Sequence, residues 1–106
     1  MTLYRYDTYG WLAADIDETA QRVGEVLGIE LEPRHSLYHG DYYGWRGPGQ
    51  ADLLLQQNFI EDDGLPTDDE HPDHKVLLYA SVLPEDWFDA LMRLPGVERL
   101  SSSVLP

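Results

Sequence analysis

The sequence predicts an α+β fold, in which two helices pack on one face of a single, mainly antiparallel sheet of five or six strands. Strand-like runs outnumber helical ones, and only two segments have the apolar spacing of a helix. Several strand-like runs are joined by short turns, which favours antiparallel neighbours. The predicted order is β-α-β-β-β-β-α-β. At 106 residues, the chain is expected to form one domain over residues 1–106.

The best helical pattern covers Asp15–Gly28. Asp15 is a suitable N-cap, and Glu18 completes a capping box. Gly24 within the helix indicates either close packing or a local imperfection, since Gly costs about 1 kcal/mol relative to Ala. Gly28 can adopt the left-handed conformation that ends a helix. One apolar stripe is formed by Ile16, Ala20, Val23 and Leu27.

Most of the remaining chain reads as strands. Tyr and Trp in Leu3–Leu12 favour a first strand. Glu30–Trp45 reads as a hairpin that turns near Gly40, and Ala51–Ile60 is expected to extend it into a three-stranded meander. Lys75–Leu83 is the most apolar run and is predicted to be a central strand.

A second helix is predicted to begin at Pro84, a residue suited to the first helical position. Arg93 is expected in the last turn, where a cation interacts favourably with the helix dipole. Pro95 and Gly96 then stop the helix, and Val97–Leu105 is predicted to be the final strand.

Acidic residues are concentrated in one segment, Glu61–His74, between two predicted strands. Seven of its fourteen residues are carboxylates, and none is Lys or Arg. Pro66 and Pro72 disfavour a long helix there. We therefore expect a loop that presents negative charge to a partner.

The whole chain is also strongly acidic, with 20 acids, 7 Lys and Arg, and a formal net charge of −13. This charge disfavours nucleic acid and anionic membranes as partners and favours a basic protein. The simpler alternative is that acidity only keeps a small protein soluble. No run approaches the roughly 20 apolar residues that span a bilayer, so we expect a cytoplasmic protein.

Metal and catalytic chemistry are only weakly indicated. His71 and His74 lie among carboxylates, but Pro72 between them breaks the regular spacing that would align them on one metal. Cysteine is absent, and no phosphate loop, nucleophile elbow or zinc-protease motif occurs. His35 with Asp41 or Tyr42 could form an acid–base group, but an ordinary strand residue is the simpler interpretation. We therefore predict no enzyme, no cofactor and no metal site.

Aromatic residues gather on the predicted hairpin. Tyr43 and Trp45 share one face of a strand and are expected to pack on the core, which turns Tyr42 to the opposite face. Exposed Tyr and Trp anchor many protein interfaces. Tyr42 is therefore a candidate contact for a partner.

Several short motifs together resemble small bacterial immunity proteins, which are encoded beside polymorphic toxins, including those of contact-dependent growth inhibition systems. The resemblance covers roughly Val26 to Tyr79 and more loosely the last helix and strand. The motifs are Val26-Leu27-Gly28-Ile29-Glu30-Leu31, Arg34-His35-Ser36-Leu37-Tyr38, Gly40-Asp41-Tyr42-Tyr43, Leu53-Leu54-Leu55-Gln56-Gln57-Asn58 and Leu77-Leu78-Tyr79.

The resemblance implies a cytoplasmic protein that binds and blocks a cognate toxin domain, often a nuclease, and it carries no catalytic residues with it. A nuclease has a basic cleft because it must hold phosphates, and an acidic loop could occupy that cleft. The expected toxin-binding residues are Glu61, Asp62, Asp63, Asp68, Asp69, Glu70, Asp73, Asp41 and Tyr42. The toxin, its activity and the oligomeric state stay open.

A second interpretation is a non-catalytic regulatory module. Such a module would bind a small molecule or a cation, either near the hairpin or at the two histidines His71 and His74. It predicts a rise in melting temperature when the ligand is added.

Overall fold

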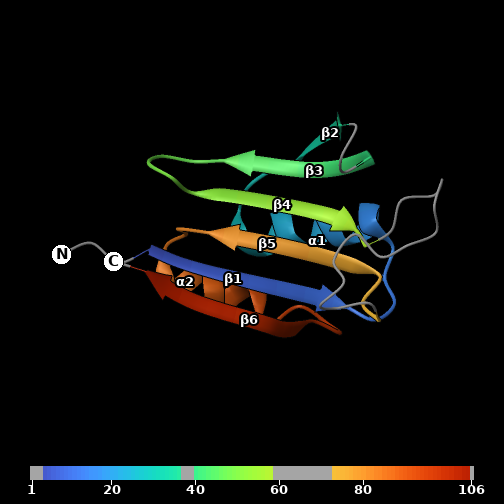
Figure 1. Cartoon of the computed structure of the whole chain (residues 1–106). Helices are drawn as coiled ribbons and strands as arrows, with labels where there is room; N and C mark the ends of the chain where they lie inside the picture. Colours follow the sequence, from blue (N-terminus) through green and yellow to red (C-terminus); the bar gives the residue numbers. More distant parts are fainter. Residues whose placement is uncertain (1–3, 37–39, 59–72, 106) are drawn as a thin grey trace.

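The computed structural model describes residues 4–36, 40–58 and 73–105. They form one antiparallel sheet with the strand order β2-β3-β4-β5-β1-β6, together with two helices (Figure 1). The predicted α+β class and the element order are confirmed. The elements are β1 (Tyr4–Trp11), α1 (Ile16–Leu27), β2 (Glu32–Ser36), β3 (Gly40–Arg46), β4 (Asp52–Gln57), β5 (Val76–Ser81), α2 (Glu85–Leu91) and β6 (Glu98–Leu105).

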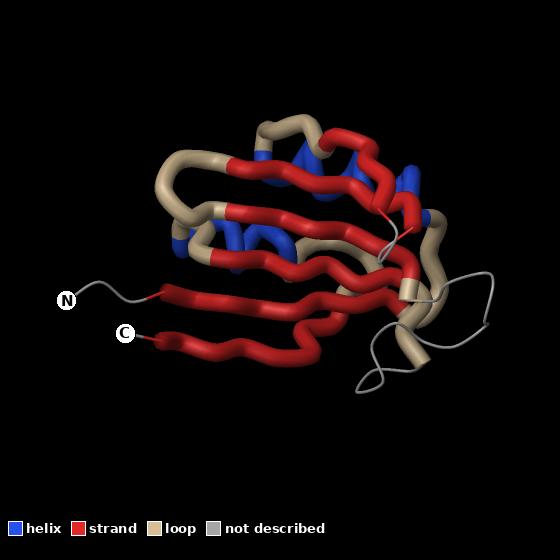
Figure 2. Tube along the Cα trace, turned by 45° about the horizontal axis from the view of Figure 1, so that its top comes forward, coloured by secondary structure: helices blue, strands red, loops and turns tan. Residues whose placement is uncertain are grey.

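Both helices lie on the same face of the sheet (Figures 1 and 2). α1 contacts β4 and α2. The strands β2, β3 and β4 form the predicted meander, and β5 occupies an interior position between β4 and β1. The prediction that Lys75–Leu83 contains a central strand is therefore confirmed.

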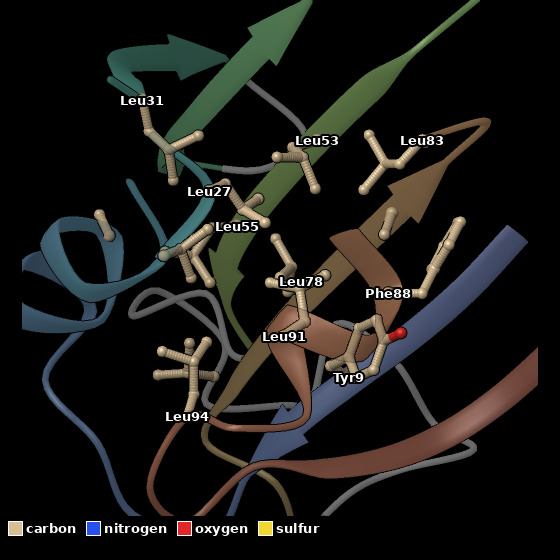
Figure 3. Close-up of a cluster of buried hydrophobic side chains, with 14 of the residues drawn as sticks. Tyr9, Leu27, Leu31, Leu53, Leu55, Leu78, Leu83, Phe88, Leu91 and Leu94 are labelled. Atoms are coloured by element: carbon tan, nitrogen blue, oxygen red, sulfur yellow. The ribbon is translucent and has the colours of Figure 1, made fainter. Parts of the chain in front are cut away.

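The core lies between the sheet and the helices (Figure 3). Its largest fully buried aromatic residues are Tyr9 from β1 and Phe88 from α2, which are 0% and 1% exposed. Leu residues from β4, β5 and both helices fill the space around them. Apolar burial of this kind contributes about 25 cal/mol per Å² and is the main term that holds the two layers together.

The N-cap predicted for α1 is confirmed, because the Asp15 carboxylate accepts hydrogen bonds from the backbone N–H groups of Asp17 and Glu18. The capping box is only half formed. The Glu18 carboxylate accepts hydrogen bonds from Arg22 one turn further along α1. Gly28 ends the helix with φ of 72°, in the left-handed region that Gly adopts without strain.

Gly24 is a packing requirement of α1 rather than an imperfection. A Cβ atom at this position would lie 2.6 Å from the backbone oxygen of Ile29, which cannot move aside as a side chain would. We therefore expect Gly24→Ala to destabilise the protein by about 1–3 kcal/mol, although Ala is the better helix former. Urea unfolding would measure this loss. Gln21→Ala, at an exposed site on the same helix, should change stability by less than about 0.5 kcal/mol, and equal effects would contradict the packing account.

Three predicted boundaries are wrong, namely the end of β5 and both ends of the second helix. β5 ends at Ser81 because Val82 has φ of 55°, a left-handed conformation that is unusual for a β-branched residue and interrupts the strand. The second helix begins after Pro84, which has extended ψ and acts as the N-cap. It ends at Leu91, so Arg93 lies in the following turn and not in the helix.

Candidate protein-binding surface

Backbone hydrogen bonds join the described residues that flank the acidic segment. The N–H of Asn58, just after β4, donates to the backbone oxygen of Lys75 at 2.8 Å. The N–H of Lys75 in turn donates to the backbone oxygen of Trp11, also at 2.8 Å. The described residues on either side of positions 59–72 therefore meet where β1 and β4 end and β5 begins.

The strand registers bring more acidic residues to this same end of the sheet. Six carboxylates of the described residues lie there, at the start of α1, β3 and β6 and just before β5. We call this set the acidic end. Lys75, Arg99 and Arg22, which pairs with Glu18, are also near, so acids still outnumber bases there among the residues that the structure describes. The acidic end consists of Asp15, Asp17, Glu18, Asp41, Asp73 and Glu98.

A groove of about 380 Å³ lies at the acidic end, between the start of α1 and the β2–β3 hairpin. Asp17 and Tyr43 both line it, and the Tyr43 hydroxyl donates to the Asp17 carboxylate at 2.5 Å. This hydrogen bond, with a smaller contribution from burial, raises the pKa of Tyr43. The remaining lining residues are Ile16, Pro33, Asp41, Tyr42 and Gln57.

A second groove, of about 470 Å³, continues along α1 from the same Asp17–Tyr43 pair. Its floor is made of small and apolar residues, including Ala20 and Gly24. Glu25 and Glu30 add carboxylates to its lining, and no Lys or Arg lines it. The acidic end therefore extends into a concave, partly apolar surface that suits the long stem and cationic head of Lys or Arg.

The predicted binding residues divide into two groups. Asp41 and Asp73 are exposed at the acidic end. The other acids predicted to bind a toxin lie outside the described residues, so the structure does not test their placement. They are Glu61, Asp62, Asp63, Asp68, Asp69 and Glu70.

Tyr42 lies on the sheet face opposite the helices, as the alternation predicts. It pairs with Gln56 on β4, which in turn pairs with Leu77 on β5. Gln56 and Leu77 are 2% and 0% exposed, and Tyr42 itself is half-buried. Tyr43 and Trp45 point toward the helices, and the Trp45 ring meets that of Trp87 with 5.2 Å between centroids. Both residues are thus packed against the core, as predicted.

The structure does not test the pairing of the two histidines considered for a metal. His71 lies outside the described residues, whereas Nε2 of His74 lies 3.1 Å from a carboxylate oxygen of Glu98. No group of three or more His, Asp or Glu in residues 4–36, 40–58 and 73–105 could hold a metal ion. His35 does pair with Asp41, at 2.9 Å, but both side chains are largely in solvent.

Sequence reasoning missed a buried charged network on the helix face of β1. The Asp7 carboxylate, with a side chain that is 0% exposed, receives hydrogen bonds from Arg5 at 3.0 and 3.1 Å. It also accepts from the hydroxyls of Tyr9 at 2.7 Å and Ser102 at 2.6 Å. Arg5 also contacts Glu85 on α2.

The same network attaches α2 to the sheet. The guanidinium of Arg5 lies 4.2 Å from the centre of the Phe88 ring, close enough for a cation–π interaction. Burial alone would raise the pKa of Asp7, but the hydrogen bonds from Arg5, Ser102 and Tyr9 outweigh it and hold that pKa below its usual value. Burial, followed by the hydrogen bond to Asp7, raises the pKa of Tyr9. The network thus consists of a fixed anion and a fixed cation, and its geometry indicates a structural role.

Comparison with known proteins does not assign the chain to a family. No protein-family model matches the chain, and no curated protein sequence matches it. Within the described residues, no helix is long and apolar enough to cross a membrane.

Proposed function

We propose that this chain is an immunity protein that binds a cognate basic toxin domain, a nuclease by preference, and blocks it in the cytoplasm of the producing bacterium. The observation that carries this proposal is the acidic end. Six described carboxylates lie there, including Asp73 of the segment Glu61–His74, and the sequence of that segment contains six further acids. Nucleic acid and anionic membranes are poor partners for such a surface.

We assign different roles in binding to the two kinds of surface at the acidic end, the exposed carboxylates and the grooves. Exposed carboxylates such as Asp41 and Asp73 steer a basic partner and raise the association rate. The grooves on either side of Tyr43 then receive Lys or Arg side chains, whose stems cover the apolar floor. Desolvated contacts of this kind supply most of the binding energy in protein interfaces.

A growth-protection assay tests the proposal. The toxin would be the small basic domain encoded by the neighbouring reading frame, co-expressed with this chain. We expect the unchanged chain to restore growth, and Asp41→Lys/Asp73→Lys to restore it at least about tenfold less efficiently because the reversed charges repel a basic domain.

The matched control carries the same charge change away from the acidic end. Asp86→Lys/Asp89→Lys replaces two exposed acids of α2 and should protect as well as the unchanged chain. Equal loss of protection in both variants, with both folded, would mean that net charge and not the acidic end governs the interaction. No protection by the unchanged chain would overturn the proposed function for that toxin.

A further inference from the structure

The two edges of the sheet differ in how well they are protected against pairing with another strand. The β2 edge is five residues long and carries Pro33 between charged neighbours, all of which discourage strand addition. The β6 edge is eight residues long and contains no Pro. Among the described strands it pairs only with β1, and it forms the outer edge of the sheet (Figure 2).

The second half of β6 is both regular and uncharged. A register shift opposite Thr8 and Tyr9 interrupts the pairing with β1 early in β6, whereas Ser101–Leu105 pairs without interruption. This stretch reads Ser-Ser-Ser-Val-Leu and has no charged side chain. Val104 and Leu105 are 54% and 53% exposed, so one end of the stretch places apolar surface in water.

We infer that β6 is a self-association edge, on which a second copy of this chain adds its own β6 antiparallel about a two-fold axis. The neutral stretch is a poor match for the basic partner proposed above, because it offers that partner no carboxylate. The same stretch of a second copy is a better partner. Antiparallel pairing centred on Ser103 places Ser102 opposite Val104 and Ser101 opposite Leu105, which covers the exposed apolar groups in both copies.

The face assignments of these residues agree with this register. Ser101, Ser103 and Leu105 pair with Thr8, Tyr6 and Tyr4, so they lie on the face away from the helices. Ser102 and Val104 pair with Asp7 and Arg5, on the helix face. Each proposed cross-copy pair thus joins residues of the same face, as an antiparallel ladder requires. The result is one continuous sheet through two copies.

The net charge of −13 on each copy opposes this association. Added salt screens that repulsion, so the dimer should strengthen as salt rises. A complex with a basic toxin should weaken under the same change. The self-association edge does not depend on the proposed function, and the sign of the salt effect separates the two interactions.

Sedimentation velocity of the full chain alone tests the inference, at low and high salt and at protein concentrations up to about 1 mM, because a short strand interface is weak. We expect a monomer–dimer equilibrium that shifts toward dimer at high salt. Val104→Glu/Leu105→Glu should raise the dissociation constant at least about tenfold, since edge charges oppose strand pairing.

The control adds the same two charges at exposed apolar residues elsewhere. Leu12 and Met92 are 52% and 41% exposed, and Leu12→Glu/Met92→Glu should dimerise like the unchanged chain. Circular dichroism would establish that both variants are folded. A chain that stays monomeric at every concentration and salt level would overturn the inference, as would equal weakening in the two variants.

Discussion

Replacing Asp7 by Ala is expected to destabilise the protein by about 3 kcal/mol, because breaking a buried ion pair leaves its partners without compensation. Arg5, Tyr9 and Ser102 all direct donors at this one carboxylate. Without it, the Tyr9 hydroxyl stays buried and unpaired, and Arg5 keeps only the exposed Glu85 carboxylate. Urea or thermal unfolding measures the loss.

Glu85→Ala provides the matched control, because it removes the other carboxylate that Arg5 contacts. Glu85 has a side chain that is 80% exposed, so its loss should cost less than about 1 kcal/mol. If Asp7→Ala cost no more than Glu85→Ala, the buried network would not contribute to stability beyond its exposed ion pair.

The same network gives stability a defined dependence on pH. The folded pKa of Asp7 lies below that of the unfolded chain, so its stabilisation is fully present above the unfolded pKa of about 3.9. It is lost as the pH falls through the lower, folded pKa. Asp7→Asn keeps the shape but cannot titrate, so its stability should be lower at neutral pH and should fall less steeply below about pH 4.

Neutralising five acids of the segment, with Asp62, Asp63, Asp68 and Asp69 changed to Asn and Glu70 to Gln, is expected to weaken binding to the basic toxin domain about 10- to 100-fold. The reason is that an ion pair in contact with water typically contributes a few tenths of a kcal/mol to about 1 kcal/mol. The association rate should fall most, and its dependence on salt should flatten. Surface plasmon resonance at several salt concentrations measures both quantities.

Five carboxylates outside the segment and the acidic end provide a control with the same change in net charge. Their neutralisation should reduce the association rate only slightly, because long-range steering decays over a Debye length of about 8–10 Å in ordinary buffers. An identical loss in both variants would assign the effect to net charge alone. The control acids are Glu32, Asp52, Glu85, Asp86 and Asp89.

Local signals in the sequence were sufficient to predict much of the fold. The Asp15 cap, the Gly28 end and the apolar stripe of α1 are each encoded within a few residues. A nearly continuous apolar run located β5 and indicated an interior strand. The boundary errors have local causes that composition does not reveal, such as the left-handed backbone of Val82.

The strand order and the Asp7 network could not be predicted, because both depend on contacts between distant residues. Asp7 and Ser102 are 95 positions apart but hydrogen-bonded through the β1–β6 pairing. The alternation of Arg5, Asp7 and Tyr9 on one strand was visible in the sequence. The sequence did not show that α2 packs on this face, so its burial could not be predicted.

Only part of the candidate surface was identified from the sequence. The segment Glu61–His74 and the residues Asp41 and Tyr42 were identified from charge and aromatic content. Asp17 was not, because its contribution depends on the start of α1 lying beside the hairpin, where Tyr43 donates to it. A short polar residue in the first turn of a helix otherwise indicates only a favourable dipole interaction.

The central claim, that this chain binds a basic toxin domain through its acidic end, is tested most directly by one calorimetric titration. The titrant is the basic domain encoded by the neighbouring reading frame, and the titration is carried out at low and at high salt. The account predicts a one-to-one complex whose dissociation constant rises at least about tenfold between about 50 mM and 500 mM salt. No binding at low salt, or an affinity that does not change with salt, would contradict it.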